Sequence, residues 1–416
     1  MSKLCLAPWV STYIYPDGGV SPCCESQVNG KVYTCGSLHE NTLTEIWNNE
    51  RYKKIRSDMI KYGYSEVCHA CYNLENSGSK SRRNFFNDNY SHHRDKIKLT
   101  KEDGTLDKVN IVYWDVRLSS TCNFKCRMCG PLLSSSWVNE LDKNTNFLEE
   151  FFGDDEIDVV KTNADLNFLD SEKFLNENIF LFDIIESVYF AGGEPLLMDI
   201  HYKILKKLIQ FKKTNIPISY TTNFSVLKYK NINILNLWSL FPNLTISISV
   251  DGIGKKGELI RKGFNWDRFI SNCLEFKKKF PKKTLTITPA LQSLNCFDIF
   301  ELQKELFRLK IVNNVDNFWF SVVQSPDYLS ILILPDNLKQ RFCDMVDDHV
   351  TNFLIPNKAS IEQIKLWVNT KKFIWSKDDQ DLIPKFLRYT ESLDIIRNEN
   401  TKETFPELND LWNYDQ

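Results

Sequence analysis

Residues 120–133, STCNFKCRMCGPLL, place Cys122, Cys126 and Cys129 in the spacing C-x3-C-x2-C. Thiolate ligands favour soft metals such as zinc, or iron in a sulfur cluster. A structural zinc site needs a fourth Cys or His nearby, but the next such residues along the chain are His201 and Cys273. The spacing also differs from that of four-cysteine ferredoxins. The triplet therefore predicts an iron–sulfur cluster in which one iron has no protein ligand.

The composition around this stretch is that of a globular protein, with 42% hydrophobic and 25% charged residues in a chain of 416. A formal net charge of -2 provides no basic field for nucleic acid. The N-terminus lacks the apolar segment of a signal peptide, and no apolar run is long enough to span a membrane. We therefore expect a cytoplasmic protein with no membrane or nucleic-acid partner.

Twelve cysteines are many for such a protein, and nine of them precede residue 130. Clustered cysteines in a reducing compartment favour metal ligation over disulfides. The three isolated ones, Cys273, Cys296 and Cys343, are expected to be small buried hydrophobic residues.

Six short runs rich in apolar and β-branched residues follow one another after residue 108, and most gaps between them are long enough for a helix. This alternation predicts an α/β fold with a parallel sheet, in the form of a partial (β/α)6 TIM-like barrel. Active sites on such sheets lie at the C-terminal ends of the strands. The runs are VNIVYWDVRL (109–118), ESVYFAGG (186–193), IPISYTTN (216–223), LTISISVDG (244–252), TLTITPAL (284–291) and FWFSVVQ (318–324).

The flanking segments predict two further parts. WVSTYIYPDGGVSPCC (9–24) has the pattern of a β-hairpin with an Asp-Gly turn, and residues 39–61 have helical periodicity with Asn41 or Thr42 as N-cap. Residues 75–108 are polar and rich in breakers, which predicts a linker. We therefore expect a cysteine-rich module with its linker at 1–105, the partial barrel at 106–335 and a helical C-terminal extension at 336–416.

The combination of these motifs resembles the radical S-adenosylmethionine (radical SAM) enzymes. CNFKCRMC follows the first predicted strand and GGEP the second, TTN and ISVDGIG end the third and fourth, and ELIRKGFNWDRF comes next. The resemblance extends over about residues 109–325. It implies that Cys122, Cys126 and Cys129 are catalytic and hold a 4Fe–4S cluster, and that S-adenosyl-L-methionine (SAM) chelates the open iron. Reductive cleavage of SAM would then give a 5′-deoxyadenosyl radical that abstracts hydrogen from a substrate.

The resemblance also implies positions for SAM contacts. Gly192 and Gly193 would let the backbone approach the methionine moiety, and Glu194 would accept from its ammonium group. Asn223 and Ser249 would hydrogen-bond the ribose or the carboxylate, although a turn role for Asn223 remains open.

Two more positions belong to this implied set. Arg261 would pair with the methionine carboxylate, with a surface helix arginine as the alternative. Met128 would lie beside the adenine, with a core methionine as the alternative. Asp251, in an Asp-Gly pair, is explained equally well by turn chemistry and stays outside the set.

The first 75 residues resemble the auxiliary-cluster extension called SPASM or twitch, which usually follows the barrel rather than preceding it. The family's G-x4-C element corresponds to Gly18 and Cys23, and its C-x2-C to Cys68 and Cys71. With Cys5 these cysteines would close a second, auxiliary 4Fe–4S cluster. Cys24 is an alternative to Cys23, Cys35 is spare, and a four-cysteine zinc site is an alternative to the cluster.

The substrate implied by these resemblances is a peptide or protein side chain. The alternatives are a radical SAM dehydrogenase or C–C bond-forming enzyme acting on a small molecule and, more distantly, a non-catalytic zinc or iron–sulfur module. A flavodoxin- or ferredoxin-type electron donor is the expected partner. Trp319, Gln324 and Tyr328 follow the last strand and are candidates to line the substrate site.

Overall fold

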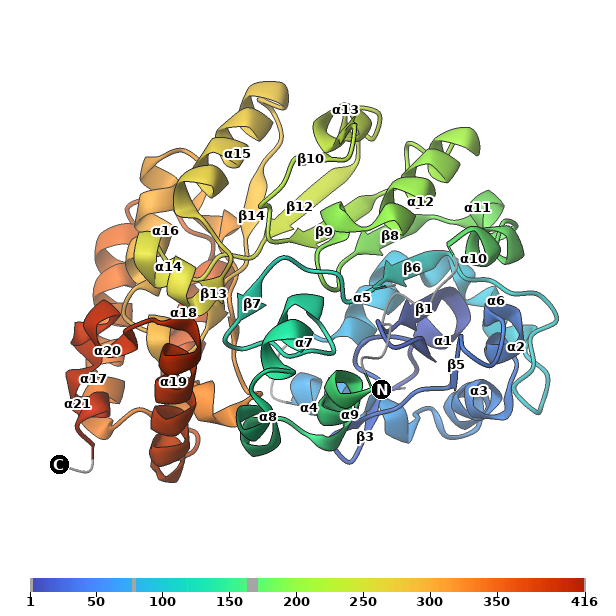
Figure 1. The fold of residues 1–416 in the computed structure, drawn as a ribbon. Helices are drawn as coiled ribbons and strands as arrows, with labels where there is room; N and C mark the ends of the chain where they lie inside the picture. The colour runs from blue at the N-terminus through green and yellow to red at the C-terminus, as the bar shows by residue number, and fades with distance from the viewer. Residues whose placement is uncertain (1–2, 77–79, 118, 163–170, 415–416) are drawn as a thin grey trace. The chain divides into compact units, whose positions relative to one another are not determined.

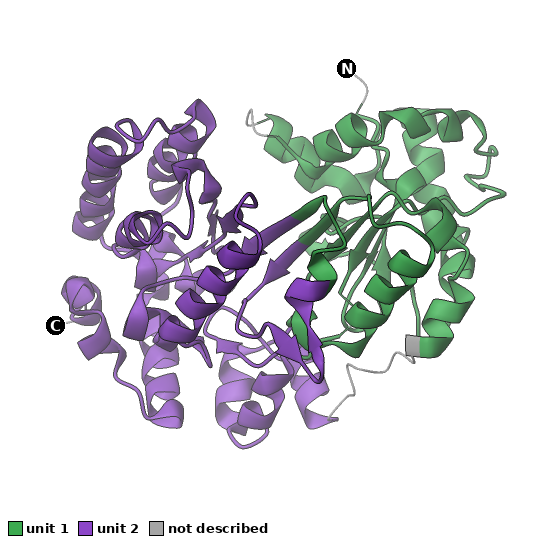
Figure 2. Ribbon diagram, turned by 90° about the horizontal axis from the view of Figure 1, so that it is seen from above, with its two compact units in different colours: residues 1–121, 165–219, 237–244 green, residues 122–164, 220–236, 245–416 purple. Residues whose placement is uncertain are grey.

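The computed structural model describes residues 3–76, 80–117, 119–162 and 171–414, and Figure 1 shows the order of its elements along the chain. The chain forms two compact units, coloured in Figure 2. Unit 1 comprises residues 1–121, 165–219 and 237–244, and unit 2 comprises 122–164, 220–236 and 245–416. Each unit combines segments that are distant in the sequence, and the predicted boundaries at residues 105 and 335 stay a prediction.

The predicted N-terminal hairpin is present in unit 1. Strand β1 (Ser11–Ile14) pairs antiparallel with β2 (Gly19–Ser21). In the turn, Asp17 Oδ1 accepts from the backbone N–H of Gly19 at 2.9 Å. Gly18 has a φ of 85°, a conformation that favours glycine. The Asp-Gly pair thus makes the turn that its sequence predicts.

The hairpin is part of the main sheet of unit 1, whose strand order is β8-β6-β1-β2-β5. Strand β1 pairs in parallel with β6 (Tyr113–Val116), the first of the six predicted strands. On its other side β6 pairs in parallel with β8 (Ser187–Phe190), the second. The cysteine-rich module therefore extends this sheet by strand addition, a connection that the sequence pattern did not predict. The other short strands of the module are β3 (Gln27–Val28), β4 (Lys31–Val32) and β5 (Gly36–Ser37).

Helices surround this sheet of unit 1. The periodic segment at 39–61 forms two helices rather than one, because Thr42 caps the first and Asn49 caps the second. The predicted linker contains helix α5, which Ser81 caps through a capping box; residues 77–79 of that segment lie outside the described ones. The helices are α1 (Ala7–Val10), α2 (Leu43–Trp47), α3 (Glu50–Tyr62), α4 (His69–Asn76), α5 (Arg82–Asn89), α6 (Asp95–Lys98), α10 (Ser171–Glu177), α11 (Leu181–Ile184) and α12 (Asp199–Gln210).

The later predicted strands lie in or enter unit 2. Strand β12 (Leu244–Ile248) pairs in parallel with β14 (Leu285–Ile287), and β15 (Ala290–Leu291) pairs in parallel with β16 (Ser321–Val322). Strand β9 (Ile218–Thr222) is next to β12, since Ser249 N donates to Thr222 O at 2.9 Å. Strand β9, β12 and helix α13 (Ile234–Trp238) are divided at the unit boundary. All six predicted strands are thus present, and the α/β class is confirmed. The remaining strands are β7 (Lys125–Cys126), β10 (Lys228–Tyr229), β11 (Ile232–Asn233) and β13 (Arg261–Lys262).

The predicted helical C-terminal extension is also confirmed, and it belongs to unit 2. Five of its helices are α17 (Asp336–His349), α18 (Ile361–Ile374), α19 (Ile383–Arg397), α20 (Thr401–Thr404) and α21 (Asn409–Trp412), and a π-helical turn (Val350–Leu354) follows α17. The other helices of unit 2 are α7 (Ser135–Leu141), α8 (Thr145–Phe151), α9 (Asp154–Lys161), α14 (Gly254–Ile260), α15 (Trp266–Lys279) and α16 (Ile299–Arg308).

The interior of both units is rich in tryptophan, with Trp9 and Trp47 buried in unit 1 and Trp137 and Trp367 buried in unit 2. The three isolated cysteines, Cys273, Cys296 and Cys343, are buried as predicted. Within the described ranges, none of the helices combines the length and apolar character needed to cross a bilayer.

Candidate active site

The three-cysteine loop of unit 2 is held by a short strand pair. Cys126 lies in β7 and pairs antiparallel with Arg261 of β13. The loop then turns back, with Cys129 N donating to Cys126 O at 3.0 Å. The indole N–H of the buried Trp137 also donates to Cys126 O, at 3.2 Å. The backbone around the second cysteine is therefore fixed by three separate contacts.

The thiols of this loop lie close to one another. Burial raises the pKa of Cys129, and negative charge on Cys126 or Cys122 raises it further. Burial also raises the pKa of Cys126, which the nearby Arg261 opposes. Neutral thiols are poor ligands, and metal binding displaces their protons. Three adjacent buried thiols are thus suited to a cluster that takes up their negative charge.

Arg261 connects this loop to the end of strand β12. Its NH1 group donates to Cys126 Sγ at 3.7 Å, while Nε and NH2 bind the two carboxylate oxygens of Asp251 at 2.7 and 3.1 Å. Asp251 is fully buried and also accepts from the backbone N–H of Ala290 at 2.8 Å. The arginine predicted to bind SAM therefore lies beside a cluster cysteine, paired with an aspartate that the sequence did not single out. Its expected contact with the methionine carboxylate stays a prediction.

The GGE segment follows β8 in unit 1 and contacts the segment that leads into Cys122. A Cβ at Gly193 would lie 2.3 Å from Thr121 O, and one at Gly192 would lie 3.1 Å from Arg117 Cβ. Gly192 also has a φ of 100°. Both glycines are therefore needed for the close approach of two loops of this chain, a reason distinct from the predicted contact with methionine.

Glu194 is completely buried rather than solvated. Its backbone N–H donates to Thr121 O at 2.7 Å, and its Oε1 accepts from the N–H of Leu196 at 3.0 Å. The carboxylate thus caps a short 3-10 turn, Pro195–Leu197. This fixes the side chain next to the strand end where the resemblance places the SAM ammonium group.

Asn223 and Ser249 lie at the ends of β9 and β12. Asn223 Nδ2 donates to Asn123 Oδ1 at 3.0 Å, and its Oδ1 accepts from Ser225 N at 2.9 Å. The side chain therefore has a turn role and also contacts the residue after Cys122. Ser249 is partly exposed. Their contacts with SAM stay a prediction.

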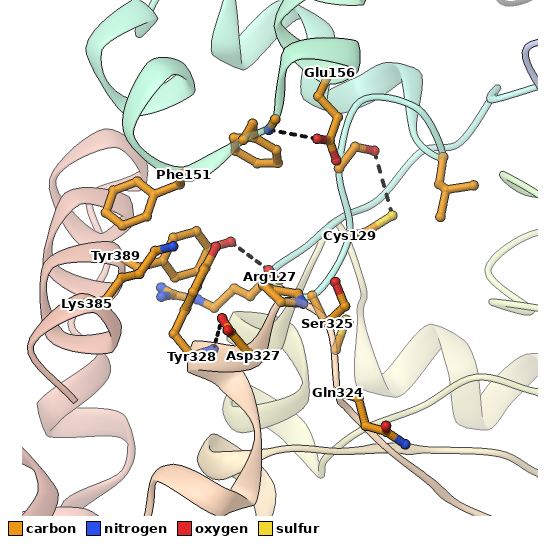
Figure 3. A pocket seen from close by; sticks show the side chains of 16 residues that line it. Arg127, Cys129, Phe151, Glu156, Gln324, Ser325, Asp327, Tyr328, Lys385 and Tyr389 are labelled. Carbon is orange, nitrogen blue, oxygen red and sulfur yellow. Dashed lines mark hydrogen bonds between the residues drawn. The ribbon is translucent and has the colours of Figure 1, made fainter. Parts of the chain in front are cut away.

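A cavity of about 630 Å³ opens beside the cluster loop within unit 2 (Figure 3). Its wall includes Met128 and Cys129, and it also includes Gln324 and Tyr328, two of the three residues expected to line a substrate site. Trp319, the third, is 40% exposed and does not line this cavity. The volume is in the range of small-molecule sites. The remaining lining residues are Arg127, Gly130, Leu133, Phe151, Phe152, Gly153, Glu156, Ser325, Pro326, Asp327, Lys385 and Tyr389.

Helix α19 of the C-terminal extension holds the same loop from another side. The fully buried Arg127 donates to Asp394 at 2.8 Å and to Glu399 at 3.0 Å. The hydroxyl of Tyr389 donates to Arg127 O at 2.6 Å. Arg397 pairs with Glu140 at 2.8 Å and lies over the ring of Trp137. The sequence contains no local signal for these contacts, because their partners are more than 250 residues apart.

Four cysteines of the N-terminal module lie near one another in unit 1. Burial raises the pKa of Cys5 to about 12, and burial is also the main cause of the raised pKa values of Cys23, Cys68 and Cys71. Secondary increases come from neighbouring thiols: Cys24, then Cys68 and Cys5, act on Cys23, Cys5 and Cys71 act on Cys68, and Cys71 acts on Cys5. These are the four cysteines predicted as auxiliary ligands.

The other two cysteines of the module have different surroundings. After burial, the main influences on the pKa of Cys24 are Arg82 and Asp115, and those on Cys35 are Arg56 and Arg51. Cys35 N donates to Val20 O at 2.6 Å. Cys35 therefore lies apart from the group, and the preference for Cys23 over Cys24 stays a prediction.

The spacing of the sulfur atoms bears on the kind of metal site. Tetrahedral zinc with bonds of about 2.3 Å holds its sulfur ligands about 3.8 Å apart. Among the described residues, no three cysteine sulfurs lie within 4.8 Å of one another. The sulfur atoms of neither group are thus placed at the spacing of a tetrahedral zinc site.

Comparison with protein families identifies two regions of the chain. Residues 5–72 match the SPASM family, described as an iron–sulfur cluster-binding domain. Residues 116–295 match the radical SAM superfamily. The first match contains all four proposed auxiliary cysteines, and the second contains the cysteine triplet and the predicted SAM contacts.

Solved structures with a similar fold include SuiB from Streptococcus suis bound to the precursor peptide SuiA, with 16% identity and a TM-score of 0.37. That match covers 74% of this chain and 62% of SuiB. Another is native anSMEcpe with bound AdoMet, with 17% identity, a TM-score of 0.40 and coverage of 60% and 63%. The chain thus spans less than two thirds of the length of these structures. The comparison with curated protein sequences returned no match.

Proposed function

Because this chain belongs to the radical SAM superfamily and contains a SPASM iron–sulfur domain, we propose that it is an enzyme that cleaves SAM reductively. The reaction would take place at a 4Fe–4S cluster bound by Cys122, Cys126 and Cys129. The proposed substrate is a peptide or protein side chain, from which hydrogen is abstracted. Cys5, Cys23, Cys68 and Cys71 would hold the auxiliary 4Fe–4S cluster.

The observation that supports the open cluster most strongly is the isolation of the triplet. Negative charge on Cys126 or Cys122 acts on the pKa of Cys129, which relates the three thiols electrostatically. The next His and Cys after the triplet along the chain, His201 and Cys273, lie in helices α12 and α15. A structural site would need a fourth protein ligand. Three cysteines without one suit a cluster whose last iron binds the methionine amino and carboxylate groups of SAM.

The chemistry supplied by the bound cluster and SAM is one-electron cleavage of the sulfonium, followed by hydrogen abstraction from the substrate. The protein positions the ligands and shields the site. Arg261 donates to Cys126 Sγ, and the buried Asp251 holds the guanidinium in that orientation. Trp137 is buried and donates to Cys126 O, and Phe124 within the loop is also buried.

The cavity beside Cys129 supports a substrate of side-chain size. Phe151, Tyr328 and Tyr389 contribute aromatic surface, while Gln324 and Lys385 contribute polar groups. Apolar walls with a few polar groups are typical of ligand sites. A volume of about 630 Å³ accommodates one or two side chains of a longer peptide.

The proposed reaction needs an electron donor at low potential. A flavodoxin or ferredoxin supplies single electrons, and iron–sulfur clusters accept them over the required range. We therefore retain such a protein as the proposed partner.

Metal analysis tests the proposal against a zinc-binding module. The protein would be purified anaerobically and reconstituted with iron and sulfide, and iron and zinc would be counted. Two clusters predict about eight irons per chain. The electron paramagnetic resonance (EPR) spectrum of the reduced protein should change when SAM is added. Zinc in place of iron, or a spectrum that SAM leaves unchanged, would contradict the proposal.

A further inference from the structure

The sheet of unit 1 has two different faces. On one, Trp114 of β6 packs against Phe174 and Phe182, with ring centroids 6.3 and 5.4 Å away. This is the face covered by α10 and α11, next to β6 and β8 in Figure 1. Side chains alternate along a strand, so Asp115 and Arg117 point to the opposite face, which in a βα barrel is the inner one.

Two tyrosine rings flank the guanidinium of Arg117 on that inner face. Tyr13 of β1 and Tyr189 of β8 are the register partners of Asp115 on either side of it. Arg117 Cζ lies 4.7 Å from the ring centroid of Tyr13 and 5.7 Å from that of Tyr189. Its Nε donates to Asp115 Oδ1 at 3.0 Å, which is the only side-chain hydrogen bond of Arg117 among the described residues. The NH1 and NH2 groups thus lie between two aromatic rings without a carboxylate.

A second arginine reaches the same place from helix α5. Arg82 NH2 donates to the hydroxyl of Tyr113 at 3.1 Å and lies 4.0 Å from Asp115 Oδ2. Arg82 Nε is buried, and the described part of the chain provides no hydrogen-bond acceptor for it. Arg82 therefore also has donor capacity that Asp115 does not use.

The two guanidinium groups have one ion-pair partner between them. Among the described residues, Asp115, which is 2% exposed, is the carboxylate within 4.0 Å of Arg82 and of Arg117. The nearby Glu25 accepts from the Cys24 thiol at 3.9 Å and forms no ion pair with either arginine. Buried charges are normally paired, and the side chains of Arg82 and Arg117 remain 30% and 24% exposed. One guanidinium therefore has no carboxylate of its own at ion-pair distance.

Arg117 lies beside the GGE segment. Arg117 Cβ would be 3.1 Å from a Cβ at Gly192 of the GGE segment, and Arg117 precedes Cys122 by five residues. An anion held by Arg117 would therefore lie beside the GGE segment, at the C-terminal end of β6 in unit 1.

We propose that Arg117 and Arg82 bind a carboxylate of the substrate, either an acidic side chain or the C-terminus of a peptide. This inference rests on the proposed function and specifies its substrate class. A carboxylate matches both the guanidinium left without an ion-pair partner of its own and the planar fork of arginine. The tyrosine rings of Tyr13 and Tyr189 flank the site and hold the Arg117 fork in place.

A binding experiment on the reconstituted protein tests this without requiring turnover. The probes are N-acetyl-glutamate amide and N-acetyl-glutamine amide, which differ only in the side-chain carboxylate, and N-acetylglycine as a mimic of a C-terminus. Saturation-transfer NMR would measure the affinity of each. We expect at least one of the two carboxylate probes to bind about tenfold more tightly than the glutamine probe. Equal binding of all three probes would overturn the inference, whether or not the protein cleaves SAM.

Variants locate the site. Arg117→Gln retains the Cβ next to Gly192 and should weaken binding of the carboxylate probe about tenfold, while Arg117→Lys keeps the charge and should weaken it less. Arg268→Gln removes an exposed arginine of α15 as the matched control. Undiminished probe binding by Arg117→Gln would overturn the inference. The inference would also be overturned if Arg117→Gln lost affinity for SAM by the same factor as for the carboxylate probe. Arg117 would then bind the carboxylate of SAM rather than that of the substrate.

Discussion

Arg127, the residue after the second cysteine of the triplet, donates to Asp394 at 2.8 Å across 267 residues of sequence. Arg127 is fully buried, and Asp394 also accepts from Thr401 N at 2.7 Å and from Thr401 Oγ1 at 2.6 Å. Burying an unpaired guanidinium is costly. The position of the cluster loop therefore depends on the C-terminal extension.

Asp394→Asn should destabilise the protein and loosen the cluster loop. Removing one partner of a buried ion pair costs about 3–5 kcal/mol, and we expect the lower part of that range because Glu399 still contacts Arg127. The shift of the urea unfolding midpoint measures the effect. Arg388→Gln is the control in the same helix, because its pair with Glu150 is exposed and worth about 0–1 kcal/mol. Equal shifts in both variants would show that the buried pair has no special role.

Gly193→Ala should disrupt the contact between the GGE segment and the segment before Cys122. The added Cβ would lie 2.3 Å from the backbone oxygen of Thr121, which cannot move aside as a side chain can. We expect a lower thermal midpoint and weaker SAM binding. Gly153→Ala is the control for the thermal midpoint, since its Cβ would meet only the end of the flexible Glu156 side chain, at 3.3 Å. A Gly193→Ala protein that binds SAM as tightly as the wild type would rule out this role.

The two adjacent cysteines of the hairpin should differ in their effect on iron content. After burial, the thiols that act on the pKa of Cys23 are Cys24, Cys68 and Cys5, whereas the pKa of Cys24 is influenced mainly by Arg82 and Asp115. Cys23→Ala should therefore remove about four irons after reconstitution, and Cys24→Ala and Cys35→Ala should retain them. Iron loss in Cys24→Ala but not in Cys23→Ala would reverse the assignment.

Stability should decrease in mild acid because of two buried histidines. Burial lowers the pKa of His201 and of His349 to about 3, from the ordinary 6.5. Between these values the unfolded chain binds protons that the folded chain does not. The stabilisation is therefore complete above pH 6.5 and decreases as the pH falls toward 3, by about 1.4 kcal/mol per pH unit for each site.

His349→Gln isolates one of these sites. An amide can still donate to Gln303 Oε1, which lies 2.7 Å from His349 Nε2, but it does not titrate. The unfolding midpoint of the variant should fall less between pH 7 and pH 5 than that of the wild type, with the exposed His39→Gln as control. Parallel pH profiles for wild type and His349→Gln would contradict this explanation.

Much of the fold was predictable because it depends on local pattern. The β-branched runs identified the six strands, and the Asp-Gly pair identified the hairpin turn. The pairing of β1 with β6 was not predictable. The apolar pattern of the first barrel strand, β6, does not specify which strand pairs with its free side. The split between α2 and α3 was also not predictable. The helical periodicity continues across it, and only the N-cap at Asn49 marks the start of the second helix.

The candidate site was predictable where several ligands lie close together in sequence, as in the cysteine triplet. Contacts made by single distant residues were not. Asp251 was left outside the predicted set because turn chemistry explains it equally well, yet it binds the guanidinium of Arg261. Asp394 and Tyr389 lie in a charged helix whose pattern indicates only a helix, and their contacts with Arg127 arise from tertiary packing.

The most direct test of the central claim is the release of 5′-deoxyadenosine from SAM by the reduced, reconstituted protein. The wild type should form it under dithionite or reduced flavodoxin. A variant with Cys122, Cys126 and Cys129 replaced by Ala should form none, while retaining the roughly four irons of the auxiliary site. Absence of 5′-deoxyadenosine from iron-loaded wild-type protein, or its continued formation by the triple variant, would contradict the assignment of this loop as the site of SAM cleavage.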